Sequence, residues 1–141
     1  MDKKRIMVVD DDEAFTRIVK LTLEQGGRYE VRVAHLGQQA MPAIREFQPQ
    51  LILLDVILPD VDGCELGAQI KADAGMSGIP IVFLTGLATG PKNAPGGFVR
   101  HGFRFVGKVM GGQELLRCVE ENLSDSSRDS HNPAAQPDNK L

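Results

Sequence analysis

Four short apolar runs, each followed by a polar residue, constrain this chain more than any other feature. The runs and the residues that follow them are 6–9 with Asp10, 51–54 with Asp55, 81–84 with Thr85, and 105–107 with Lys108. Parallel strands that are buried on both faces read as continuous apolar runs. Because the chemistry of open α/β sheets gathers outside the carboxyl ends of the strands, we expect these polar residues to converge on one site.

Helical periodicity and turn residues between the runs predict a regular alternation of strands and helices. The expected strands are 5–9, 29–34, 51–54, 81–84 and 103–106, and the expected helices are 13–25, 37–47, 65–73, a short one near 93–101, and 112–123. This alternation predicts an α/β fold, with a doubly wound five-stranded parallel sheet, five helices and right-handed crossovers.

Two segments fit this alternation poorly. Residues 86–97 contain four glycines and two prolines, so a continuous helix is not expected there. From residue 124 onward the chain has almost no apolar content, which is typical of disorder. We therefore expect one folded domain over 1–123 and a disordered tail over 124–141.

Composition excludes several classes of protein. The 141 residues have a formal net charge of -3 and no basic stripe, which argues against nucleic acid as a direct partner. No apolar stretch reaches the roughly 18 residues of a membrane span, and no signal peptide precedes the first strand. We therefore expect a cytoplasmic location without membrane insertion. Cys64 and Cys118 lack metal-site spacing and are expected to be reduced structural thiols.

The three adjacent aspartates at residues 10–12 repel one another, and a helix cap by Asp12 accounts for only one of them. A bound cation would relieve the repulsion. Mg²⁺ accepts one or two carboxylates together with water and phosphate oxygens, so a site open to a phosphate donor is expected. For these aspartates alone, a solvated acidic loop is the competing interpretation.

Asp55 can act as a nucleophile towards phosphorus if nearby cationic groups neutralise its charge. Lys108 would pair with Asp55 before the reaction and with phosphoryl oxygens after it. Each residue also has an ordinary interpretation: a turn cap for Asp55, a backbone contact for Thr85 and a solvated surface position for Lys108. The ordered set of four sites favours an aspartyl phosphorylation switch.

Over about residues 4–123 the chain resembles the receiver domain of bacterial two-component response regulators, here in a stand-alone form. The segments that carry the resemblance are IMVVDDD at 6–12, LILLDVILPDVDG at 51–63, PIVFLTG at 80–86 and FVGK at 105–108. The resemblance implies a flavodoxin-like sheet with strand order 2-1-3-4-5. It also implies a phosphorylated signalling protein that is not an enzyme in the usual sense but assists its own phosphotransfer and dephosphorylation.

The resemblance also assigns roles to individual residues. It implies that Asp55 is the phosphoacceptor, that Asp10, Asp11, Asp55 and the backbone carbonyl of Ile57 bind Mg²⁺, that Thr85 and Lys108 contact the phosphoryl group, and that Thr85 and Phe105 form the conformational switch. The implied partners are a sensor histidine kinase or phosphotransfer protein and a downstream protein target. The implied output face comprises the fourth helix, the fifth strand and the fifth helix, and a homodimer through that face is a further expectation.

One departure concerns Val109, which follows Lys108 where the family usually has proline. A changed loop that places Lys108 differently from the family is therefore an open expectation. A receiver-shaped interaction module that works without phosphorylation is another. A flavodoxin-like binder of flavin or nucleotide is a third hypothesis. The absence of a glycine-rich phosphate loop after the first strand counts against it.

Overall fold

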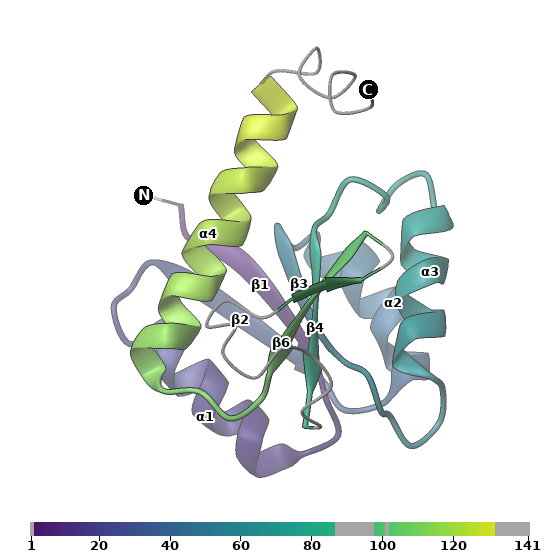
Figure 1. Ribbon diagram of the computed structural model, residues 1–141, viewed down its shortest axis with the longest axis horizontal. Helices are drawn as coiled ribbons and strands as arrows, with labels where there is room; N and C mark the ends of the chain where they lie inside the picture. Colours follow the sequence, from purple (N-terminus) through teal and green to yellow (C-terminus); the bar gives the residue numbers. More distant parts are fainter. Residues whose placement is uncertain (1, 87–97, 101, 132–141) are drawn as a thin grey trace.

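A computed structural model describes residues 2–86, 98–100 and 102–131 of the chain (Figure 1). Along the chain the elements are β1 (Lys4–Val9), α1 (Glu13–Glu24), β2 (Tyr29–Ala34), α2 (Gly37–Phe47), β3 (Leu51–Asp55), α3 (Gly63–Ala72), β4 (Ile81–Thr85), β5 (Phe98–Arg100), β6 (Phe103–Gly107) and α4 (Gly112–His131). No helix within these described ranges is both long enough and apolar enough to cross a bilayer.

The strands form one sheet in the order β2-β1-β3-β4-β6-β5. β1, β2, β3, β4 and β6 pair in parallel, and β6 is the predicted fifth strand. The predicted α/β class and the parallel order 2-1-3-4-5 are therefore confirmed. The sixth strand, β5, was not predicted and pairs antiparallel with β6 at the edge of the sheet.

The prediction of a helix near 93–101 is wrong at residues 98–100, because these residues form β5. Residues 93–97 lie outside the described residues. Gly102 follows β5 with φ +82°, a backbone conformation that glycine adopts without the strain a Cβ would add. This geometry turns the chain back, so that Val99 pairs with Arg104. The glycines near this segment indicated correctly that a helix is disfavoured, but they did not indicate a hairpin.

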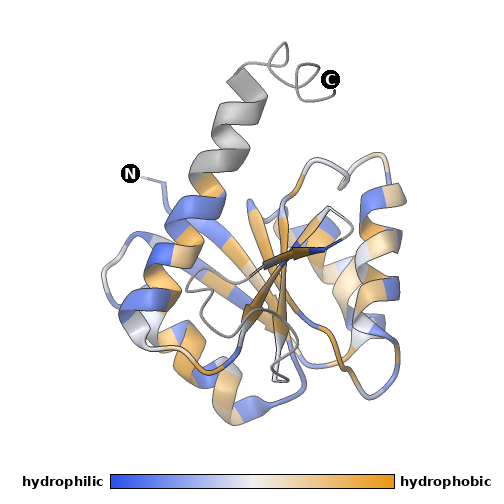
Figure 2. Cartoon of the chain, in the orientation of Figure 1, coloured by the Kyte–Doolittle hydropathy of each residue, from blue (hydrophilic) through white to orange (hydrophobic). Residues whose placement is uncertain are grey.

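Strand residues alternate between the two faces of the sheet, and helices cover both faces (Figures 1 and 2). Met7 and Val9 pack on one side with the buried side chains of α2 and α3. Ile6 and Val8 pack on the other side with those of α1 and α4. The central strands are therefore buried on both faces, which explains their uninterrupted apolar runs.

The last helix, α4, continues to His131, whereas the sequence predicted its end at residue 123 and disorder from 124. Its apolar side chains, among them Leu115 and Val119, all lie before that point. Adding a residue to an existing helix forms one more backbone hydrogen bond and needs no buried face. Figure 1 accordingly shows the end of α4 reaching beyond the sheet. The domain boundary at 123 stays a prediction.

The start of α3 lies very close to the end of β3. The Asp62 side chain accepts a hydrogen bond from the backbone N–H of Cys64 at 2.9 Å and caps the helix. The backbone N–H of Gly63 donates to the carbonyl oxygen of Val56 at 2.8 Å. A Cβ on Gly63 would collide with the carbonyl oxygen of Asp55. Glycine at this position therefore allows α3 to support the strand end that carries Asp55.

We predict that Gly63→Ala lowers the free energy of unfolding by roughly 2–3 kcal/mol, because backbone atoms have little freedom to move away from the new methyl group. Gly26→Ala is the matched control, since nothing lies within 4 Å of its Cβ position and its φ is not positive. The free energy of unfolding of Gly26→Ala should stay within about 0.5 kcal/mol of the wild-type value. Urea unfolding measures both values, and equal effects of the two substitutions would contradict this account.

Candidate functional site

Three carboxylates meet at the carboxyl edge of the sheet. β1 and β3 are neighbours with Val9 opposite Leu54, so the next residues, Asp10 and Asp55, lie side by side. One carboxylate oxygen from each of Asp10, Asp11 and Asp55 lies within 4.8 Å of the others. Asp10 is 0% exposed and Asp55 is 6% exposed, whereas Asp11 is open to solvent. The predicted convergence of these aspartates is confirmed.

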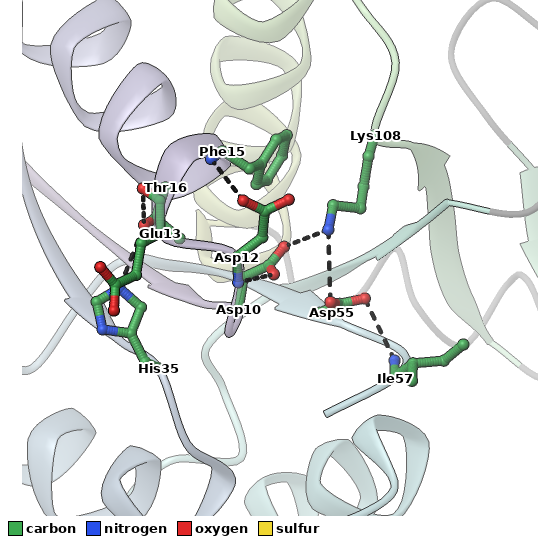
Figure 3. A network of polar contacts seen from close by, with 9 residues as sticks. All are labelled: Asp10, Asp12, Glu13, Phe15, Thr16, His35, Asp55, Ile57 and Lys108. Atoms are coloured by element: carbon green, nitrogen blue, oxygen red, sulfur yellow. Dashed lines mark hydrogen bonds and ion pairs between the residues drawn. The ribbon is translucent and has the colours of Figure 1, made fainter. Parts of the chain in front are cut away.

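Lys108 brings a positive charge to the carboxylates (Figure 3). Its Nζ lies 2.9 Å from Oδ2 of Asp10 and 3.5 Å from Oδ2 of Asp55. Its backbone N–H donates to the carbonyl oxygen of Thr85 at 2.9 Å. The Lys108 side chain is only 18% exposed, so water screens these ion pairs poorly.

Val109 does not displace Lys108 from the site. The described peptide bonds are all trans, and the Val109 side chain is 96% exposed beside the loop. Lys108 nevertheless reaches both carboxylates. Val109 therefore does not keep Lys108 out of the site, and a placement that differs from the family's stays a prediction.

Burial and charge perturb the ionisable groups. Burial is the largest cause that raises the pKa of Asp55 to about 6, and the negative charge of Asp10 raises it further. The Ile57 N–H, which donates to Oδ1 of Asp55 at 3.2 Å, and the ammonium of Lys108 oppose this shift. Burial alone would lower the pKa of Lys108, but Asp10, Asp55 and Asp12 outweigh burial and raise it. The carboxylates of Asp10, Asp55 and Asp12 thus act on one ammonium, and the site keeps an excess of negative charge.

Asp10 and Asp12 fix the backbone where β1 leads into α1. The backbone N–H of Asp12 donates to Oδ1 of Asp10 at 3.0 Å. Oδ1 of Asp12 in turn accepts a hydrogen bond from the backbone N–H of Phe15 at 3.0 Å, so Asp12 caps α1 as predicted. The three adjacent aspartates therefore have different environments: Asp10 is a buried partner of Lys108, Asp11 is exposed, and Asp12 is a cap.

Phe105 packs on the face of the sheet that α2 and α3 cover, and Thr85 follows the same alternation at the end of β4. Thr85 is 7% exposed at the end of β4, opposite Gly107 of β6. Phe105 is opposite Phe83, and their rings stack with centroids 5.0 Å apart. The alternation of strand residues places Thr85 with these two rings, because all three positions share one parity along their paired strands. The switch role of Thr85 and Phe105 stays a prediction.

Ile57 lies beside Asp55 on the loop after β3. Its backbone N–H binds the Asp55 carboxylate, it forms an isolated bridge with Asp62, and its side chain is 63% exposed. The backbone of Ile57 is thus at the site, and its carbonyl role stays a prediction.

Sequence reasoning missed the part that Phe15 plays at this site. The Nζ of Lys108 lies 4.6 Å from the centroid of the Phe15 ring, within the range of a cation–π contact. Position 15 was expected only to lie within the helix predicted over 13–25. Its place in the first turn after an acidic cluster was a signal that an aromatic ring would lie next to the site.

The sheet order and the acidic edge site together define a class of flavodoxin-like α/β proteins that collect carboxylates at the carboxyl ends of β1 and β3. The family model of the response regulator receiver domain matches residues 6–120. This match covers well over half of the chain, and the chain therefore belongs to the response regulator receiver domain family of two-component systems.

Curated relatives support the same family. The chain is 40% identical over 83 residues to "DNA-binding response regulator MtrA" of Mycolicibacterium smegmatis, covering 59% of this chain and 35% of that protein. It is 37% identical over 124 residues to "DNA-binding dual master transcriptional regulator RpaA" of Synechocystis sp., covering 88% of this chain and 51% of that protein. The chain thus spans about a third to a half of the length of these relatives.

Solved structures share the fold. A putative response regulator from Chloroflexus aurantiacus aligns with a TM-score of 0.73 and 31% identity, over 87% of this chain and 99% of that one. A CheY-like receiver domain protein from Methanospirillum hungatei aligns with a TM-score of 0.74 and 25% identity, over 91% and 99% of the two chains.

We predict that Asp55→Asn stabilises the metal-free protein near neutral pH by about 1–2 kcal/mol, because it removes a buried charge beside Asp10. The pKa of Asp55, about 6, lies above its ordinary value of 3.8. The folded state therefore binds more protons than the unfolded state between these values, and the contribution of Asp55 to stability falls as pH rises through that window. The advantage of the variant should vanish near pH 4 and be full above pH 7.

Urea unfolding in a chelator at about pH 4.5 and about pH 7.5 tests this dependence. Asp62→Asn is the matched control, because Asp62 is an exposed helix cap and asparagine caps equally well. Wild-type and Asp55→Asn proteins of equal stability at the higher pH would show that the charge of Asp55 is not destabilising.

Proposed function

We propose that this receiver domain is a phosphorylation-dependent signalling switch whose phosphoacceptor is Asp55. The observation that carries the proposal is the position of the nearly buried Asp55 carboxylate, which lies beside a second carboxylate, Asp10, and shares with it the ammonium of Lys108. The family match supports a two-component partner. We take the phosphodonor to be a phosphohistidine of a sensor histidine kinase or of a phosphotransfer protein.

The acidic residues fit a magnesium ion. Asp10, Asp11 and Asp55 offer hard oxygen donors within 4.8 Å of one another, and their charge exceeds that of Lys108. We assign the ion to these three carboxylates and to the backbone carbonyl of Ile57. When bound, Mg²⁺ supplies charge neutralisation for the carboxylates and for the incoming phosphoryl oxygens.

In phosphotransfer the protein mainly positions the reacting groups and stabilises their charge. A carboxylate oxygen of Asp55 forms the bond to phosphorus while the bond from phosphorus to the donor imidazole breaks, and its electron pair returns to the imidazole nitrogen. The Ile57 N–H orients the Asp55 carboxylate through Oδ1. Lys108 holds positive charge beside Oδ2, and the hydroxyl of Thr85 contacts a phosphoryl oxygen. Transfer of the group to water later resets the switch, so the domain assists its own phosphorylation and dephosphorylation without acting as an enzyme on another substrate.

The added charge biases the packing beyond the site. Thr85 is joined to β6 through the hydrogen bond from the Lys108 N–H, and Phe105 of β6 stacks on Phe83 of β4. Movement of Thr85 towards the phosphoryl group therefore changes the environment of the Phe105 ring. We propose that the signal reaches a downstream protein, or a second copy of the chain, through the face formed by β6, the adjoining β5 and α4. In this face β5 takes the place of the expected fourth helix.

Intact-mass spectrometry after incubation with acetyl phosphate tests the acceptor. We expect one phosphoryl increment on the wild-type protein in Mg²⁺, little without Mg²⁺, and none on Asp55→Asn. Asp62→Asn serves as the control and should match the wild type, because it changes an exposed aspartate on the same loop. An increment that persists on Asp55→Asn would place the acceptor elsewhere. No increment on any folded variant, with the donor kinase also tried, would favour an interaction module that works without phosphorylation.

A further inference from the structure

We infer that Phe15 is a positioning residue that holds the ammonium of Lys108 over the acidic site, an inference that rests on the proposed function. Figure 3 shows the ring next to the lysine, with the Nζ of Lys108 4.6 Å from the ring centroid. The Lys108 side chain is 18% exposed. A cation–π contact strengthens when the cation is shielded from water in this way.

The ring of Phe15 is itself held in place. The Phe15 backbone lies in the first turn of α1, where its N–H donates to the capping Asp12 at 3.0 Å. Its side chain is partly buried and packs against the core on the α1 and α4 side of the sheet. The ring therefore presents a fixed surface to Lys108, with little rotamer freedom left to lose on contact.

The loop that carries Lys108 offers less restraint. Gly107 is exposed, with nothing within 4 Å of its Cβ position, and the side chain of Val109 is 96% exposed. Neither neighbour anchors the loop by burying a side chain. Met110 is the next residue of the loop that packs against the core, so the placement of the ammonium also depends on the backbone bond from Lys108 to Thr85 and on the side chains that touch its Nζ.

Phe15 differs from the other groups around Nζ because it carries no charge. The pull of Asp10 and Asp55 on Lys108 depends on the negative charge of those carboxylates and weakens when a divalent cation neutralises it. The attraction of the ring for the ammonium persists in every charge state of the site. Phe15 thus keeps the ammonium in position while the charges on its other partners change. The ammonium is then in place to contact the incoming phosphoryl oxygens.

The test compares Phe15→Leu, which keeps apolar packing but loses the ring, with Phe15→Tyr, which keeps the ring. Leu21→Ala is the control, because Leu21 lies on the same helix and is 66% exposed. The first readout is NMR of the Lys108 side chain in metal-free protein. We expect an upfield ring-current shift of its terminal methylene protons in the wild type, Phe15→Tyr and Leu21→Ala, and its loss in Phe15→Leu.

The second readout is the initial rate of phosphorylation by acetyl phosphate in Mg²⁺. We expect Phe15→Leu to be slower by roughly threefold to tenfold and Phe15→Tyr to stay near the wild-type rate. In a Lys108→Met background, Phe15→Leu should change the rate no further, because a residue that acts through Lys108 has nothing left to position. Thermal unfolding of each variant identifies a folding defect, and the tyrosine variant and the methylene shift remain informative if Phe15→Leu is unstable.

The two readouts separate the inference from the function on which it rests. A wild-type protein that shows the ring-current shift but accepts no phosphoryl group would contradict the proposed function and leave the contact established. A wild type that is phosphorylated but shows no ring-current shift would overturn the positioning role. So would a Phe15→Leu rate equal to that of the wild type, or an equal slowing by Phe15→Leu in the presence and absence of Lys108.

Discussion

The ion pair between Lys108 and the fully buried Asp10 is the interaction on which the rest of this site depends. A carboxylate removed from water and left without a partner would cost several kcal/mol, so the fold that buries Asp10 requires a cation near it. Lys108 meets this requirement from the loop that follows β6, which lies on the far side of β3 and β4 in the sheet. The pair therefore ties the carboxyl edges of non-adjacent strands together and encloses Asp55 between them.

This neutralisation is incomplete, and the remaining negative charge fits the magnesium site proposed above. One ammonium faces Asp10 at 2.9 Å and Asp55 at 3.5 Å, while Asp11 adds a third carboxylate nearby. Burial is the main cause of the raised pKa of Asp55, and the residual repulsion from Asp10 adds to it. A site assembled only for stability would place apolar residues here, since exchanging buried charges for apolar groups is often neutral or stabilising. The excess negative charge instead leaves the site ready for a divalent cation and for a group that Lys108 can contact.

The sequence was informative where burial was complete and uninformative where the structure depends on turns or on contacts between distant segments. Residues 6–9 and 51–54 had to be apolar throughout because helices cover both faces of their strands, and the strand-end rule then located Asp10 and Asp55. The hairpin of β5 depends on the backbone of Gly102, which composition alone does not distinguish from a loop. The contact between Phe15 and Lys108 joins residues 93 positions apart in the chain, so the local pattern that set the ring near the acidic strand end did not identify its partner.

The environment of Lys108 has a consequence for how the domain would respond to phosphorylation. Because no proline follows the lysine, no pyrrolidine ring fixes φ at residue 109, and the position of the ammonium also depends on its side-chain partners. Charged partners, Asp10 and Asp55, change that balance whenever their ionisation or ligation changes, whereas the ring of Phe15 does not. The Lys108 N–H is bonded to the carbonyl of Thr85, so a shift of the lysine backbone is transmitted directly to the end of β4. Lys108 therefore connects the charged side chains of the site to the end of β4.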